Sequence, residues 1–196
     1  MKIKKYLFIF LIYFLTVDTI QAITPDIFVQ STVNRASKIL SKNISKNDKM
    51  NELKKVAIDT VDIKGIGRYT LGSARKSLDK EQIKEYEKIF EQYFLKSFSS
   101  RLAEYSNPEI DVYNKEILSE NYTIVNSLLK ETDKRPEIKI DWRIYTKNPD
   151  QPLIRDLIIE GLSLARTQKE EFASVLSSND GDINALFKTL EEFSNK

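Results

Sequence analysis

Four segments rich in β-forming residues follow one another in the middle of the chain, and turn residues separate each one from the next. The four segments are residues 109–117, 122–130, 137–145 and 153–160. Strands joined by such short connections pair as an antiparallel sheet. Helical patterns lie on both sides of these segments. The sequence therefore predicts an α+β fold with helices packed on one face of a curved four-stranded antiparallel sheet.

The third of these segments indicates which side chains the helices cover. Ile138, Ile140, Trp142 and Ile144 share one side, and Lys139, Asp141, Arg143 and Tyr145 share the other. Successive side chains of a strand point to opposite faces of its sheet. The alternation therefore predicts one buried face and one hydrated face.

The clearest helical pattern runs from about Lys80 to Tyr105 and carries an unusually aromatic stripe. Asp79 and Gln82 form a capping-box-like pair at its start, and the Asn107-Pro108 pair ends it. The residues of the stripe are Ile83, Tyr86, Phe90, Tyr93, Phe94, Phe98, Leu102 and Tyr105. A stripe of this kind is expected to face the sheet.

Shorter helices are expected elsewhere. One begins at Pro25 behind Thr24, where proline suits the first helical position. A second helix covers residues 50–57, and a third ends near Gly72, since glycine favours helix ends. Two more follow residue 161, with a break at residues 179–182.

The first 22 residues have the three parts of a secretory signal peptide. Lys2, Lys4 and Lys5 precede an apolar run of about twelve residues, and Ala22 is a suitable last residue before cleavage. A membrane-spanning helix needs about 20 apolar residues. We therefore expect cleavage near Ala22, a mature domain of residues 23–196, and export to the periplasm.

The amino-acid composition excludes several kinds of functional site. The chain has no cysteine and no histidine. This excludes a cysteine nucleophile, a histidine base, disulfides and a Cys/His zinc site. Without the leader, basic and acidic residues are equal in number, whereas nucleic-acid binders usually show a basic excess. No cofactor and no nucleic-acid partner are expected.

Three local groups allow a chemical interpretation and a structural one. Asp156 and Glu160 share a strand face, where solvation or hydrogen bonds to a neighbouring strand compete with paired-carboxylate catalysis. The Gly65-Ile66-Gly67 run lacks the strand and lysine of a phosphate loop. A group of basic side chains could meet a lipid phosphate or form an exposed cluster. Its members are Arg68, Arg75 and Lys76.

Several stretches, taken in order, resemble one known family. They are residues 61–72 (VDIKGIGRYTLG), 79–82 (DKEQ), the aromatic helix, 156–164 (DLIIEGLSL), 171–176 (EFASVL) and 181–190 (GDINALFKTL). The stretch at 156–164 is the most specific. Together they resemble the MlaC family, the periplasmic phospholipid-binding component of Mla lipid trafficking, also described as a toluene-tolerance auxiliary component of an ABC transporter.

The chain departs from the family pattern at three points. Ser73-Ala74 stands where an aromatic residue usually follows the "LG" pair, and Leu153 replaces the usual tryptophan. Lys169 stands where the family usually has arginine, and lysine cannot repeat a bidentate guanidinium contact.

The resemblance implies helices over a four-stranded sheet with a deep apolar cavity between them, and no enzymatic activity. It implies shuttling of phospholipid between an outer-membrane lipoprotein–porin complex and an inner-membrane ABC transporter with an MCE-domain subunit. The cavity-lining residues that it suggests are Ile66, Tyr69, Phe90, Tyr93, Phe94, Phe98, Leu102, Val112, Ile138, Ile140, Trp142, Ile144, Ile159 and Leu162. The pattern alone favours a filled core for these residues, and it is the family resemblance that favours a cavity.

Two other function classes stay open at this point. A periplasmic adaptor that binds only proteins would have a filled core and an exposed apolar patch. An enzyme with a cone-shaped α+β cavity would need convergent ionisable groups with shifted pKa values.

Overall fold

The computed structural model describes residues 23–133 and 135–196. The predicted signal peptide lies outside these residues. The helices are α1 (Pro25–Leu40), α2 (Lys46–Thr60), α3 (Ile63–Thr70), α4 (Lys80–Leu102), α5 (Leu164–Ser177) and α6 (Ile183–Ser194), with a 3-10 turn η1 at Ala74–Lys76. In the part of the chain that is described, no helix is both long and apolar enough to cross a membrane.

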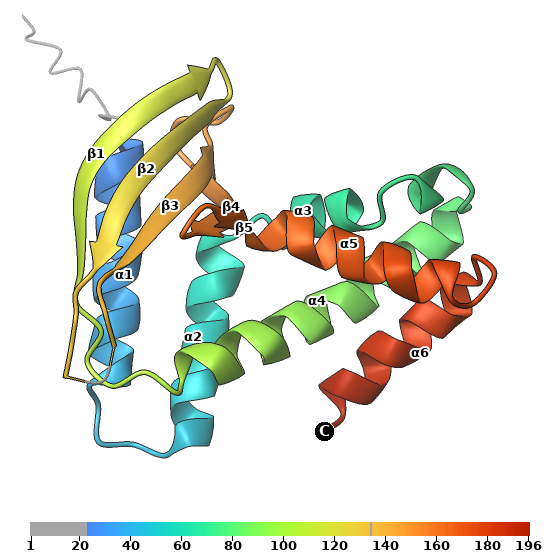
Figure 1. Ribbon diagram of the computed structural model, residues 1–196, viewed down its shortest axis with the longest axis horizontal. Coiled ribbons are helices and arrows are strands. Elements are labelled where there is room, and N and C mark those ends of the chain that lie inside the picture. Colours follow the sequence, from blue (N-terminus) through green and yellow to red (C-terminus); the bar gives the residue numbers. More distant parts are fainter. Residues whose placement is uncertain (1–22, 134) are drawn as a thin grey trace, which may run out of the picture.

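The strands form one open antiparallel sheet in sequence order (Figure 1). They are β1 (Ile110–Ser119), β2 (Tyr122–Leu129), β3 (Ile138–Tyr145), β4 (Leu153–Ile159) and β5 (Leu162–Ser163). The α+β prediction is confirmed, but the described sheet has five strands and not four. The fifth was missed because it is only two residues long and follows a tight turn in which Glu160 and Gly161 both have positive φ.

Local signals set the start of the aromatic helix as predicted. The Asp79 carboxylate accepts from the Gln82 backbone N–H at 2.7 Å, and the Asp79 N–H donates to the Gln82 side chain at 3.1 Å. This is a complete capping box. Helix α4 ends at Leu102, three residues before the predicted end.

The two faces of the sheet differ as the alternation predicts. In β3, residues Ile140, Trp142 and Ile144 are buried, whereas the residues between them are only half-buried. The opposite face carries a polar ladder across three strands. Asn114 donates to Asn126 at 3.1 Å, and Asn126 donates to Asp141 at 2.7 Å.

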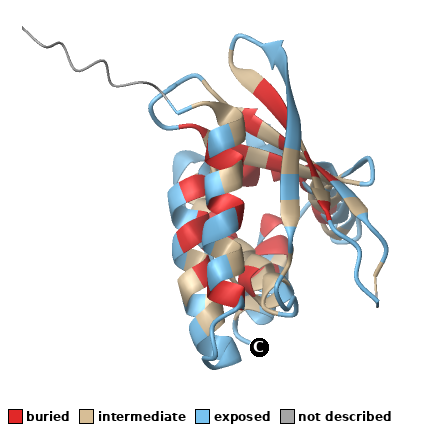
Figure 2. Ribbon diagram, turned by 90° about the vertical axis from the view of Figure 1, so that its left-hand side faces the viewer, coloured by how far each residue is buried: buried red, intermediate tan, exposed pale blue. Residues whose placement is uncertain are grey.

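Helix α1 protects the edge strand β1. The Gln30 side-chain oxygen accepts from the Val112 N–H at 3.3 Å, and its amide nitrogen donates to the Ile110 carbonyl at 3.4 Å. The amide thus replaces a neighbouring strand, which leaves fewer free backbone groups on this edge. Figure 2 shows buried residues on α1 and on the strands beside it.

The core has two parts. The main cluster joins buried residues of all six helices and of the sheet, including Ile66, Phe90 and Trp142. A smaller cluster between α1 and α2 contains Ile39, Leu40, Leu53 and Val56.

Replacing Gly67 with alanine is expected to destabilise the protein. A Cβ atom at this position would lie 2.8 Å from Cδ1 of the fully buried Phe90 ring. Overpacking of this kind costs about 1–3 kcal/mol, which exceeds the gain of about 1 kcal/mol in helix propensity. Urea unfolding measures the change. Lys64→Ala, an exposed change in the same helix, serves as control, and an equal effect of both variants would contradict the steric explanation.

Candidate functional site

Four aromatic rings run along one side of helix α4. Tyr86, Phe90, Phe94 and Phe98 are each four residues apart, and successive ring centroids are 5.7, 6.1 and 5.7 Å apart. Residues at this spacing lie above one another on a helix. We call these four rings the aromatic row.

Burial decreases along the aromatic row. Tyr86 and Phe90 are 0% and 1% exposed, whereas Phe94 and Phe98 are only partly buried at the edge of the main core. The row therefore leads from the closed interior toward the surface. Its C-terminal half presents aromatic area that the protein's own side chains do not fully cover.

The two C-terminal helices enclose the inner half of the row. The Phe172 ring of α5 packs edge-on against Phe90 at 6.2 Å, and the Phe187 ring of α6 stacks on Tyr86 at 6.2 Å. Neither residue was among the predicted site residues. The sequence showed only that each of these residues lies on the apolar face of a helix. The helical spacing of apolar residues does not show which other element packs against that face.

Trp142 anchors the sheet side of the interior. Its indole N–H donates to the Ser127 hydroxyl at 2.8 Å, and that hydroxyl donates to the Ile140 carbonyl at 3.0 Å. All three residues are buried. This polar link is satisfied inside an apolar face, so it fixes the orientation of the indole.

The structure gathers most of the predicted cavity residues in one region. Those that belong to the main core or pack on its edge are Ile66, Phe90, Tyr93, Phe94, Phe98, Val112, Ile138, Ile140, Trp142 and Ile144. Ile159 is half-buried and lies opposite Ile140 in the sheet.

Three predicted residues lie elsewhere. Tyr69 is 46% exposed on α3, where its ring contacts the Lys169 ammonium at 5.1 Å. Leu162 is 59% exposed because β5 is a short edge strand behind the tight turn. Leu102 packs on the smaller cluster between α1 and α2, since the end of α4 has passed beyond the main core.

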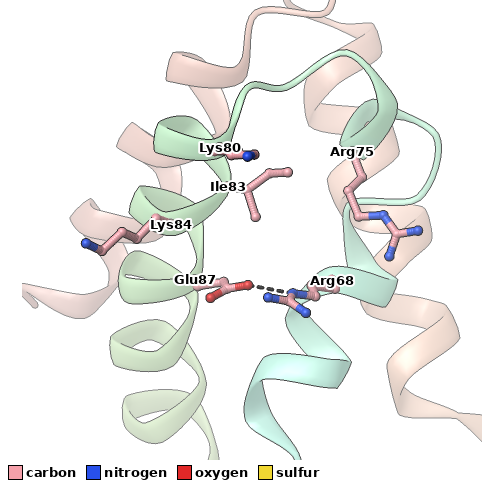
Figure 3. A pocket seen from close by; sticks show the side chains of 6 residues that line it. All are labelled: Arg68, Arg75, Lys80, Ile83, Lys84 and Glu87. Atoms are coloured by element: carbon pink, nitrogen blue, oxygen red, sulfur yellow. Dashed lines mark hydrogen bonds and ion pairs between the residues drawn. The ribbon is translucent and has the colours of Figure 1, made fainter.

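Two open pockets lie on the surface of the described residues. Polar and aliphatic side chains of α1 line one of them, between Ile27 and Lys38. The other is lined by Arg68, Arg75, Lys80, Ile83, Lys84 and Glu87 (Figure 3). Neither is the apolar cavity between helices and sheet that the family resemblance implies. That cavity stays a prediction.

The candidate catalytic carboxylates have structural roles. The buried Asp156 accepts from the Ser163 hydroxyl at 2.6 Å and from the Ala165 N–H at 3.0 Å. It thereby joins β4 to the start of α5. Glu160 lies apart from it, in the turn, and accepts from the Lys139 N–H. Among the described residues, no group of three or more acidic side chains could hold a metal ion.

An ion pair joins α3 to the sheet. Arg155 of β4 donates to the Asp62 carboxylate at 2.5 Å, and Asp62 also caps α3 by accepting from the Gly65 N–H at 2.8 Å. The Arg155 guanidinium lies 4.1 Å from the centroid of the Tyr145 ring. These groups are mutually paired, which suits a structural role.

Tyr86 predicts how stability changes at high pH. Its hydroxyl is 2.7 Å from the Thr70 hydroxyl, and burial raises the pKa of Tyr86 above the usual value of 10.0. The unfolded chain therefore loses this proton first, so the free energy of unfolding should fall as pH rises above about 10. Tyr86→Phe is expected to reduce that fall. Urea unfolding between about pH 8 and 11 measures it.

In Tyr86→Phe, the free energy of unfolding should still fall to some extent at high pH, because burial also raises the pKa of Tyr93. Tyr113→Phe, at an exposed position, is the control. An unchanged pH dependence in Tyr86→Phe would contradict the assignment.

The described elements define a class of protein: α+β, with helices on one face of an open antiparallel sheet and a row of aromatic rings inside. The chain belongs to the MlaC family, since the family model described as MlaC protein matches residues 30–192.

A solved structure has a similar fold. It is the phospholipid-binding protein from Ralstonia solanacearum, determined in complex with a phospholipid. The two chains are 18% identical with a TM-score of 0.72, and the match covers 86% of this chain and 95% of that one. No curated protein matches this chain significantly.

Proposed function

We propose that this protein is a periplasmic phospholipid carrier that holds acyl chains against the outer half of the aromatic row. The observation that carries the proposal is the position of Phe94 and Phe98, which are partly uncovered yet continuous with the main core. Membership in the MlaC family and the fold shared with a phospholipid-binding protein support it.

The physical requirement is apolar area. A two-chain phospholipid has on the order of thirty methylenes, and at about 0.8 kcal/mol each their exposure to water costs about 24 kcal/mol. Aromatic rings offer large apolar area with few rotatable bonds, so they lose little entropy on binding. The partly uncovered rings of Phe94 and Phe98 supply such area without an acid, a base or a metal.

The carrier needs no catalytic group. The chain has no histidine or cysteine, and Asp156 is occupied with structural hydrogen bonds. Burial raises the pKa values of Tyr86 and Tyr93, which is opposite to the lowered pKa that a tyrosine general base would need at physiological pH. These features favour a binding protein over the enzyme alternative.

The proposed cellular role follows from the family and from the signal-peptide pattern of residues 1–22. The mature protein would move phospholipid through the periplasm between an outer-membrane lipoprotein–porin complex and an inner-membrane ABC transporter with an MCE-domain subunit. Such a shuttle makes only transient contact with each complex.

Native mass spectrometry of the exported protein tests lipid binding. The expected spectrum contains a species heavier than the apo-protein by the mass of a phospholipid, which organic extraction then identifies. Protein that is repeatedly lipid-free, and that takes up no lipid from vesicles, would overturn the proposal. The same spectrum gives the mature N-terminus and thus tests cleavage near Ala22.

A further inference from the structure

The basic pocket between α3 and the start of α4 is not explained by the acyl-binding role. It measures about 440 Å³ and lies between α3, η1 and the first two turns of α4. Four cationic side chains and one carboxylate line it. The mature chain has equal numbers of acidic and basic residues, so this excess of positive charge is local.

The single carboxylate is already neutralised. Glu87 accepts from Nε of Arg68 at 2.6 Å, and the Lys64 ammonium is 3.6 Å from its other oxygen. The Glu87 side chain is only 10% exposed. The carboxylate therefore holds Arg68 in position and contributes little repulsion toward an incoming anion.

Two cations are available for a ligand. Within the described residues, Arg75 and Lys80 make no ion pair, and Arg75 lies across the pocket from Lys80 and Ile83 (Figure 3). Lys84 contributes its aliphatic stem, while its ammonium points away in this view. The pocket thus combines a cationic rim with the apolar side chain of Ile83.

We propose that this pocket binds a phosphate group. A guanidinium presents a planar fork of N–H donors that matches phosphate oxygens, and the ammonium of Lys80 adds a second charge-assisted donor. The concave shape favours a small anion over the flat acidic surface of a protein. Ile83 would contact the carbon backbone of a phosphate ester.

The phosphate could belong to a lipid headgroup or to a soluble phosphate ester. On α4, the residues that line the pocket fall between Lys80 and Glu87, whereas the uncovered rings of Phe94 and Phe98 lie further along the same helix. At about 1.5 Å per residue, the midpoints of these two parts of α4 lie roughly 19 Å apart along the helix. The interpretation that a lipid headgroup binds in this pocket rests on the proposed phospholipid-binding function. Binding of a soluble phosphate ester does not depend on that function.

The test is an NMR titration of the exported protein with glycerol 3-phosphate and, separately, with dihexanoyl phosphatidylglycerol at constant ionic strength. The expected result is a saturable shift of backbone amides in residues 68–87. Arg75→Gln combined with Lys80→Gln should weaken the binding by at least about tenfold, since two charge-assisted contacts are lost. Lys55→Gln combined with Lys147→Gln removes the same charge elsewhere and should leave it unchanged.

Each outcome is decisive. Shifts with the lipid alone support a headgroup as the source, and equal shifts with both ligands support a soluble phosphate. Overturning results are no shift with either ligand, shifts no larger than those with chloride, or equal weakening in the control variant. Native mass spectrometry of the same samples reports copurified lipid, so the pocket can fail while the carrier function stands.

Discussion

Replacing Phe94 with aspartate is expected to lower the amount of copurified phospholipid by at least about tenfold, because a carboxylate beside acyl chains costs several kcal/mol and each 1.4 kcal/mol is tenfold in affinity. Phe94 is only partly buried, so the variant should fold. Lipid content is measured by native mass spectrometry and stability by thermal unfolding. Phe94→Leu keeps an apolar side chain and should retain lipid.

The matched control for this prediction is Tyr113→Asp. Tyr113 is an exposed aromatic residue on β1 and belongs neither to the aromatic row nor to the main core. Introducing the same charge there should leave lipid content unchanged. If Phe94→Asp keeps its lipid, or if the control loses as much, the uncovered half of the row is not the lipid-contacting surface.

Replacing Trp142 with alanine is expected to destabilise the protein by about 3–5 kcal/mol, the usual cost of removing a buried aromatic side chain. The indole is buried and donates to Ser127, so the change creates a cavity and removes a buried hydrogen bond. Urea unfolding must be followed by circular dichroism, because Trp142 is the single tryptophan of the chain.

Trp142→Phe separates the two causes. It keeps most of the ring and loses the hydrogen bond, so we expect a smaller cost of about 1–2 kcal/mol. A loss of lipid in Trp142→Ala without a loss of stability would contradict the structural role assigned here. Trp142 would then line a cavity, as the sequence comparison with the family suggested.

For Trp142 and Phe94, the structure differs from what the sequence pattern could show. Both lie on apolar faces, and the family resemblance assigned both to one cavity. The structure buries Trp142 within the core and leaves Phe94 partly uncovered. The exposure of a side chain depends on which neighbouring helices and strands cover it. The spacing of apolar residues within one helix or strand does not show which elements those are.

The basic pocket illustrates the same limit. Arg68 and Arg75 were recognisable as basic residues near one another in sequence, together with Lys76. The pocket includes the two arginines but takes Lys80 and Lys84 from the next helix, and not Lys76. The turn at η1 brings α4 alongside α3, and only that packing decides which cations converge.

The sequence by itself determined the elements whose causes are local. The Asp79–Gln82 capping box, Pro25 at the start of α1 and the alternation of β3 depend on neighbouring residues, and each was predicted from them. The tertiary structure alone decided the fifth strand, the outward position of Tyr69 and the contact of Leu102 with α2. These depend on which faces exclude water from one another, a property that arises only when distant segments pack together.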